Sequence, residues 1–298
     1  MQGKPFPRWL GVAILVVIAV TFGSNHIAAR IAFDHGVNVI TAVAFRSGGT
    51  ALAVLALLLA MRAPLRLSAP KFWRAAGIGV VLGVQSYCLY SSVRLLPVAL
   101  ALLAFNTFPM IFSLMSWAAG VERLSRTALI AMPVALAGLA LALDVLGASG
   151  EVATRWTEIG AGVAYATGAS VCFAFALFLS ARWLPGVDGK LRSCLTMGTV
   201  GVVAFAGAAV TGTFALPTDG AGWLAVVLLT LFYGAAITAL FVVQPHLRAS
   251  SDVAALNFEP IALLFMGWAI LGQAVGPLQI FGALVVIGAI VALGMAKR

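Results

Sequence analysis

Charged residues divide the chain into long apolar segments, and this division most constrains its fold. Glu158 and Arg182 enclose a stretch without charge, and so do Arg192 and Asp219. Each stretch reaches the ~20 residues that a helix needs to cross a bilayer. Only 9% of the residues are charged and 62% are hydrophobic, whereas soluble domains hold about 25% charged residues. The sequence therefore predicts a polytopic membrane protein.

Charges, glycines and prolines together delimit ten apolar segments. The break before the last one depends on Gly276 and Pro277, because proline is unfavourable inside a helix. We expect an all-α polytopic membrane protein with a five-helix unit at 1–146, a linker at 147–156 and a second five-helix unit at 157–298. The ten expected transmembrane helices lie at about 9–29, 38–61, 73–93, 97–119, 126–146, 157–183, 193–214, 221–245, 252–272 and 276–296.

The two units resemble each other. A shift of 151 residues superposes four pairs of residues: Asn106 on Asn257, Pro109 on Pro260, Met115 on Met266 and Trp117 on Trp268. A fixed internal period is the signature of a repeat. Because five helices is an odd number, the second copy must cross the membrane in the opposite direction. Such inverted repeats are typical of secondary transporters, which hold their substrate near the bilayer midplane.

Basic residues predict the orientation. With a cytoplasmic N-terminus, 14 of them fall inside and 3 outside, and Arg46 falls within a helix. This bias follows the positive-inside rule, places both termini in the cytoplasm and explains the net charge of +9 without a nucleic-acid partner. The first apolar segment is too long for a signal peptide. The inside set is Lys4, Arg8, Arg62, Arg66, Lys71, Arg74, Arg123, Arg126, Arg182, Lys190, Arg192, Arg248, Lys297 and Arg298, and the outside set is Arg30, Arg94 and Arg155.

The sequence contains no motif that supports an enzyme or an ATP-driven pump. A phosphate-binding GxxxxGK[ST] loop is absent from the sequence, and the three cysteines show no metal-ligand or disulfide spacing. Residues 147–150 match the GxSG of intramembrane serine proteases, but Ser149 is expected in an outer loop far from a histidine. We expect no catalytic residue, metal or cofactor. A passive channel is an alternative to a carrier, and it would conduct without saturation.

Several residues together resemble the EamA family of the drug/metabolite transporter superfamily. The first unit carries the pattern from Tyr87 to Gly138 through Pro97, Pro109 and Glu122-Arg123-Leu124, and Phe45-Arg46 also matches. The second unit repeats Glu259-Pro260 and Gly272 but has Gln273 where the family usually has glutamate. Within the superfamily the pattern is most similar to bacterial exporters of aromatic amino acids. This resemblance implies a ten-helix basket in the bacterial inner membrane, a monomer, and efflux of aromatic and other neutral amino acids.

Ionisable and amide side chains inside the membrane are candidate site residues. Glu259 is a candidate for a substrate amine or a proton, or for a structural carboxylate that joins helix ends. Arg46 could attract a substrate carboxylate, although a snorkelling or inter-helix role is favoured. Asn106 and Asn257 approach the centre from opposite faces, and their amides suit either a zwitterion or helix–helix bonding.

Tyrosine is scarce, and all four copies fall within predicted helices. Buried hydroxyls need hydrogen-bond partners, so the four are candidates for a wet cavity that stacks on substrate rings, with ordinary helix packing as the alternative. They are Tyr87, Tyr90, Tyr165 and Tyr233.

Gating and coupling are predicted from few residues. The polar cluster of Ser24, Asn25 and His26 could form a gate near the outer end of the first helix, although a solvated helix end is the favoured interpretation. Pro109 and Pro260 are candidate hinges for alternating access. Because Glu259 has the apolar Phe108 as its repeat partner, we expect uncoupled, facilitated export, with proton-coupled efflux of drugs or other metabolites as the alternative.

Overall fold

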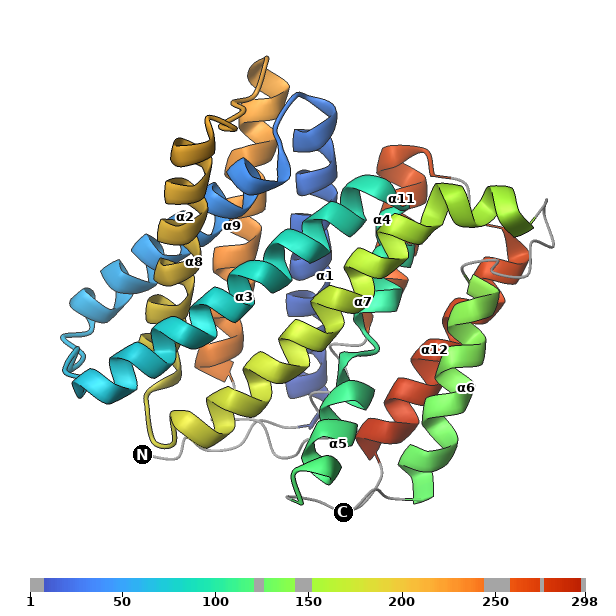
Figure 1. Ribbon diagram of the computed structural model, residues 1–298, viewed down its shortest axis with the longest axis horizontal. Coiled ribbons are helices and arrows are strands. Elements are labelled where there is room, and N and C mark those ends of the chain that lie inside the picture. The colour runs from blue at the N-terminus through green and yellow to red at the C-terminus, as the bar shows by residue number, and fades with distance from the viewer. Residues whose placement is uncertain (1–7, 121–125, 143–151, 244–257, 274–275, 296–298) are drawn as a thin grey trace.

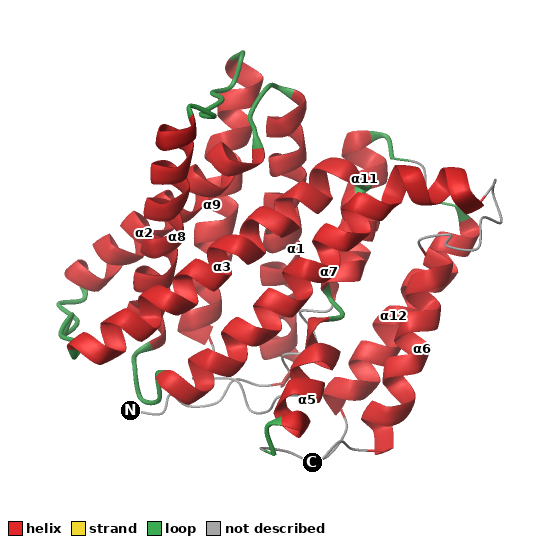
Figure 2. Ribbon diagram, in the orientation of Figure 1, coloured by secondary structure: helices red, strands yellow, loops and turns green. Residues whose placement is uncertain are grey.

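A computed structural model describes residues 8–120, 126–142, 152–243, 258–273 and 276–295. Every regular element in these residues is a helix (Figures 1 and 2). The elements are α1 (Arg8–Asp34), α2 (Val39–Ala60), α3 (Ala69–Leu95), α4 (Val98–Phe105), α5 (Phe108–Ala118), α6 (Arg126–Ala142), α7 (Val152–Trp183), α8 (Gly189–Thr211), α9 (Gly220–Val243), α11 (Glu259–Leu271) and α12 (Pro277–Met295).

The helices account for most of the expected spans. Seven stretches are long and apolar enough to cross a membrane, and α4 and α5 together form one of them. Three shorter apolar helices fall within the expected spans 126–146, 252–272 and 276–296. Several boundaries differ from expectation by four or five residues. Helix α1 continues to Asp34, α3 begins at Ala69 and α8 begins at Gly189. Helix α7 begins at Val152, so residues 152–156 of the expected linker are helical.

The helices pack chiefly in pairs. Helix α1 lies against α9, α2 against α8, α3 against α7, and α6 against α12. Glycine permits the closest of these approaches. A Cβ at Gly282 of α12 would lie 2.4 Å from the Ala142 backbone nitrogen of α6, and a Cβ at Gly201 of α8 would lie 2.9 Å from the Gly48 nitrogen of α2. Small residues at such crossings let membrane helices pack backbone to backbone.

The fourth expected span, 97–119, is not one helix. It breaks between α4 and α5 because Pro109 lacks an N–H and its ring conflicts with the carbonyl four residues earlier, which belongs to Phe105. The freed carbonyls keep partners: Thr107 Oγ1 donates to Ala104 O at 2.8 Å, and Ser170 Oγ of α7 donates to Phe105 O at 3.0 Å. Pro109 and Pro260 both occupy the first turn of a helix, α5 and α11 respectively.

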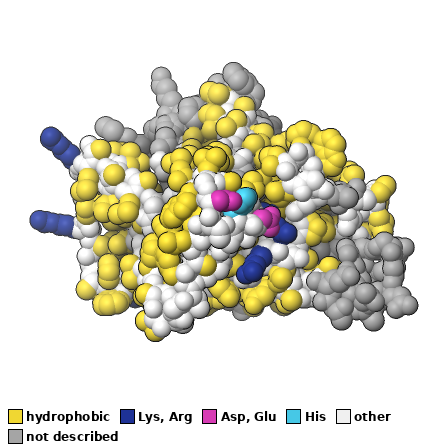
Figure 3. Space-filling view, turned by 90° about the horizontal axis from the view of Figure 1, so that it is seen from above, with side chains coloured by type: hydrophobic (Ala, Val, Ile, Leu, Met, Phe, Trp, Pro, Cys, Tyr) yellow, Lys and Arg dark blue, Asp and Glu magenta, His cyan; other side chains and the backbone are white. Residues whose placement is uncertain are grey.

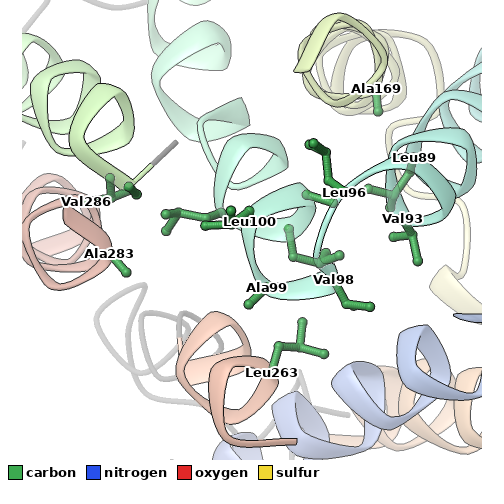
Figure 4. Close-up of a cluster of buried hydrophobic side chains, with 14 of the residues drawn as sticks. Leu89, Val93, Leu96, Val98, Ala99, Leu100, Ala169, Leu263, Ala283 and Val286 are labelled. Carbon is green, nitrogen blue, oxygen red and sulfur yellow. The ribbon is translucent and has the colours of Figure 1, made fainter. Parts of the chain in front are cut away.

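The largest apolar cluster surrounds α4. Figure 4 shows Val98, Ala99 and Leu100 of α4 among side chains from α3, α7, α11 and α12. All residues of α4 from Val98 to Ala104 are buried. The short helix is therefore covered by protein on every side, and its broken end lies inside the bundle.

One end of the bundle, uppermost in Figure 1, joins the α1–α2 turn to the α8–α9 loop. His35 Nδ1 lies 2.8 Å from Asp219 Oδ2, and Thr218 donates from both its nitrogen and its hydroxyl to His35 O at 3.1 Å. Figure 3 shows this end, where acidic side chains and a histidine lie together among apolar ones. The Gly222 backbone N–H, followed by the His35 ring, holds the pKa of Asp219 below its ordinary value. We call these contacts the upper latch.

Candidate functional site

A buried arginine organises the most polar part of the interior. Arg46 of α2 is only 3% exposed, and its guanidinium lies over two tyrosine rings. The guanidinium carbon is 4.7 Å from the ring centroid of Tyr90 on α3 and 4.2 Å from that of Tyr233 on α9. Arg46 Nη2 donates to Ser86 Oγ at 2.7 Å. Both rings provide cation–π attraction, which grows when the cation is desolvated.

Helices α1 and α11 complete the site. Tyr90 OH donates to Asn25 Oδ1 at 2.8 Å, and the His26 ring meets the Tyr90 ring edge-on at 5.9 Å between centroids. His26 Nε2 lies 3.5 Å from Glu259 Oε1. Tyr90 thus lies between the arginine and the His26–Glu259 pair. We call Asn25, His26, Arg46, Ser86, Tyr90, Tyr233 and Glu259 the arginine chamber.

Several buried polar side-chain atoms of α1, α2 and α3 have no hydrogen-bond partner among the described residues. The six atoms are Asn25 Nδ2, His26 Nδ1, Arg46 Nε, Ser47 Oγ, Thr50 Oγ1 and Ser92 Oγ. Buried polar groups in folded proteins are normally paired with protein or with water, and each exception calls for an explanation. Three of these atoms, on Asn25, His26 and Arg46, belong to the arginine chamber, and a ligand or water bound there would satisfy them. The arrangement suits binding of a polar solute at membrane depth.

The predicted gate residues lie deeper than expected. Because α1 continues nine residues past Asn25, this side chain is not at a solvated helix end, and the favoured interpretation of the Ser24–His26 cluster is wrong. Asn25 is 0% exposed and His26 is 5% exposed. Ser24 Oγ donates to Val20 O of its own helix and contacts Met266 Sδ. A gating role for Ser24 and Asn25 stays a prediction.

The four predicted tyrosines divide into two pairs. Tyr90 and Tyr233 line the arginine chamber, whereas Tyr87 of α3 meets Tyr165 of α7 edge-on at 6.4 Å between centroids. Tyr87 and Tyr165 line a separate pocket of about 610 Å³, whose lining also includes Arg94 and the facing ends of α2 and α8. Of the four tyrosines, therefore, only Tyr90 and Tyr233 belong to the arginine chamber.

Of the two predicted asparagines, the structure describes only Asn106. Asn106 is the C-cap of α4, and its Nδ2 donates to Leu102 O at 2.7 Å, which favours a structural role in the α4–α5 break. Asn257 lies outside the described residues. Glu259, in contrast, opens α11 with a side chain that is 16% exposed, and it faces the chamber through His26.

The sequence patterns gave too little weight to Arg46, suggested His26 only as part of a gate, and did not point to Ser86. An available signal was the polar pair Gln85-Ser86 in the middle of an apolar span. Ser86 Oγ donates to Gln85 Oε1 at 3.3 Å in addition to accepting from Arg46. The described residues contain no group of histidine, cysteine, aspartate and glutamate that could hold a metal ion.

Comparisons with known proteins agree with the fold. A solved crystal structure superposes on 98% of this chain and 100% of its own with a TM-score of 0.66 and 20% sequence identity, which shows a shared fold. The curated proteins include no match to the chain. The EamA-like transporter family matches twice, over residues 9–143 and 160–295, one match in each half. The chain therefore belongs to the EamA-like transporter family, whose members are membrane transporters of the drug/metabolite superfamily.

Proposed function

We propose that the protein exports small amphipathic metabolites, in particular aromatic and other neutral amino acids, from the bacterial cytoplasm by alternating access. The observation that carries this proposal is the arginine chamber, which offers a cation, two tyrosine faces and a carboxylate inside the apolar bundle. A zwitterion with an aromatic side chain has complementary groups for each of these. Tyr87 and Tyr165, in their separate pocket, would act along the same route.

The helix pairing supports two inverted five-helix units. The 151-residue shift exchanges α1 with α7, α2 with α8, and α3 with α9, so the α3–α7 pair becomes the α9–α1 pair. The α2–α8 and α6–α12 pairs each map onto themselves. All four of these pairs are present. Such an exchange is what a two-fold axis in the membrane plane requires of inverted repeats.

The broken fourth span supports alternating access. Helices α5 and α11 both begin inside the bundle, at equivalent positions of the two units, with proline in the first turn. Discontinuous helices at the midplane are common where transporters bind substrate and change conformation. We propose that α5 and α11 tilt about Pro109 and Pro260.

We propose uncoupled transport, driven by the substrate gradient. The repeat partner of Glu259 is Phe108, so the first unit offers no second carboxylate at this depth. Proton-coupled efflux is the second candidate, and the His26–Glu259 contact favours it because both side chains can exchange a proton.

Counterflow in proteoliposomes tests the proposed function. Vesicles loaded with unlabelled phenylalanine should accumulate labelled phenylalanine transiently and saturably, and empty vesicles should not. A passive channel would give flux that rises linearly with concentration. If no neutral amino acid in a panel shows counterflow, the proposed substrate class is wrong.

Cysteine labelling tests the proposed orientation. The upper latch should face the outside and the α7–α8 turn the cytoplasm. In a cysteine-free background, a cysteine at Asp219 should react with an impermeant thiol reagent added to intact cells, and one at Gly189 should react only after lysis. The reverse pattern would contradict cytoplasmic termini.

A further inference from the structure

Arg46 is the only buried lysine or arginine in the part of the chain that the structure describes. It lies seven residues into α2, which corresponds to about 10 Å from the upper end of that helix. No described carboxylate forms an ion pair with it, and Glu259 contacts His26, at 3.5 Å from Nε2. A buried charge without a counter-charge is costly, and proteins normally pair it.

The neighbours of Arg46 do not supply the missing negative charge. The guanidinium carbon lies over the rings of Tyr90 and Tyr233, and Ser86 accepts one hydrogen bond from Nη2. Each of these groups is neutral, and Nε has no described partner at all. The unpaired Nε lies on the planar edge of the guanidinium, and this edge is therefore where a further ligand would bind. That edge matches the two oxygens of a carboxylate, which arginine binds in a fork-like manner.

We propose that the substrate completes the arginine chamber with a carboxylate bound to the edge of Arg46, so that this transporter carries organic monocarboxylates and rejects amines that lack a carboxylate. This inference rests on the proposed transport function but not on amino acids as the cargo. A single charge suits a monoanion better than a phosphate dianion, which would need a second cation in the chamber. Tyr90 and Tyr233 add apolar surface beside the carboxylate, which favours substrates with an aromatic or apolar body.

Three matched ligands separate the carboxylate from the rest of the substrate. Phenylalanine carries a carboxylate and an ammonium, 3-phenylpropionate only the carboxylate, and phenethylamine only the ammonium. We would measure the binding of each by calorimetry to the purified protein in nanodiscs. Phenylalanine and 3-phenylpropionate should bind at least tenfold more tightly than phenethylamine, because the Arg46 edge would otherwise stay unpaired. Equal or tighter binding of phenethylamine, or no binding of either carboxylate, would overturn the proposal.

Variants assign the preference to Arg46. Arg46→Gln should lose the discrimination between phenylalanine and phenethylamine, and Arg46→Lys, which keeps the charge without the fork, should restore part of it. Arg74→Gln is the matched control, because Arg74 is an exposed residue near the start of α3, and it should keep the discrimination. If Arg46→Gln does not fold, the three-ligand comparison on the wild-type protein decides alone. Retained discrimination in a folded Arg46→Gln protein would refute the role of Arg46.

The outcome also separates this inference from the proposed function. If 3-phenylpropionate binds through Arg46 but no amino acid shows counterflow, the cargo is a different carboxylate and the proposed export of amino acids fails. If amino acids show saturable counterflow but carboxylate and amine bind equally, transport stands and the role of Arg46 fails.

Discussion

The hydroxyl of Tyr90 offers a controlled test of the arginine chamber. It donates to Asn25 Oδ1 at 2.8 Å, and both side chains are 0% exposed. Asn25 Nδ2 already lacks a described partner, so Tyr90→Phe leaves the whole Asn25 amide unpaired while the ring stays over Arg46. Tyr233→Phe is the matched control, because the Tyr233 hydroxyl contacts only Met197 Sδ among the described residues, at 3.7 Å.

The expected magnitudes differ between the two variants. Loss of a hydrogen bond costs about 0.5–1.5 kcal/mol, and a stranded buried acceptor costs about 1–3 kcal/mol. Side-chain hydrogen bonds within membranes average ~0.6 kcal/mol, with a maximum of ~1.7 kcal/mol. We therefore expect Tyr90→Phe to destabilise the protein by about 1–2 kcal/mol and Tyr233→Phe by less than about 0.5 kcal/mol. Since 1 kcal/mol shifts Tm by about 2–4 °C in proteins of 150–250 residues, the two midpoints should differ measurably.

Thermal unfolding in detergent, followed by tryptophan fluorescence, gives the two midpoints. The double variant Asn25→Leu/Tyr90→Phe removes both partners, and replacement of both by apolar groups can be nearly neutral. It should therefore be more stable than Tyr90→Phe alone. Equal midpoints for Tyr90→Phe and Tyr233→Phe would show that the Tyr90–Asn25 hydrogen bond does not stabilise the chamber.

Three further predictions concern packing, the upper latch and coupling. Gly201→Ala should destabilise the α2–α8 pair by about 1–2 kcal/mol relative to Gly198→Ala in thermal unfolding. Overpacking costs about 1–3 kcal/mol, whereas a Cβ at Gly198 meets nothing closer than 3.9 Å. Equal midpoints for the two variants would contradict the close approach of α2 and α8. The pKa of Asp219 is lowered in the folded protein, so its contribution to the latch is present above the ordinary carboxyl pKa and is lost as the pH falls through the lowered value. Protection of the α8–α9 loop from hydrogen exchange, relative to the intrinsic exchange rate at each pH, should therefore fall in acid for the wild type. For Asp219→Asn the protection should already be low at neutral pH. Unchanged protection in that variant would refute the latch. Glu259→Gln should transport at a similar rate, and an imposed pH gradient should not drive uptake into proteoliposomes; uphill uptake that this variant abolishes would establish proton coupling instead.

The sequence predicted the seven long apolar spans of the described residues because charges are rare and mark the ends of membrane helices. It predicted the faces of the helices poorly. Tyr87 and Tyr90 are three residues apart on α3, yet Tyr87 is 44% exposed and Tyr90 is fully buried. A helix that is apolar on all sides carries no amphipathic stripe to show which face is inside. Pro109 signalled the α4–α5 break, but the chamber around Arg46 depends on which helices meet, and no local pattern in one sequence specifies that.

The break between α4 and α5 has a consequence for how the chain folds in the membrane. A kink in a membrane helix exposes carbonyl groups, and hydrocarbon offers them no hydrogen bond. Ser170 Oγ, from the opposite half of the chain, donates a hydrogen bond to one of these carbonyls, Phe105 O, at 3.0 Å. The first half of the chain therefore does not supply a partner for this carbonyl. The fourth span has all of these hydrogen bonds only after α7 has been synthesised and has packed against it. The hydroxyl of Ser170 makes assembly of the two halves a condition for insertion of this kink without energetic penalty.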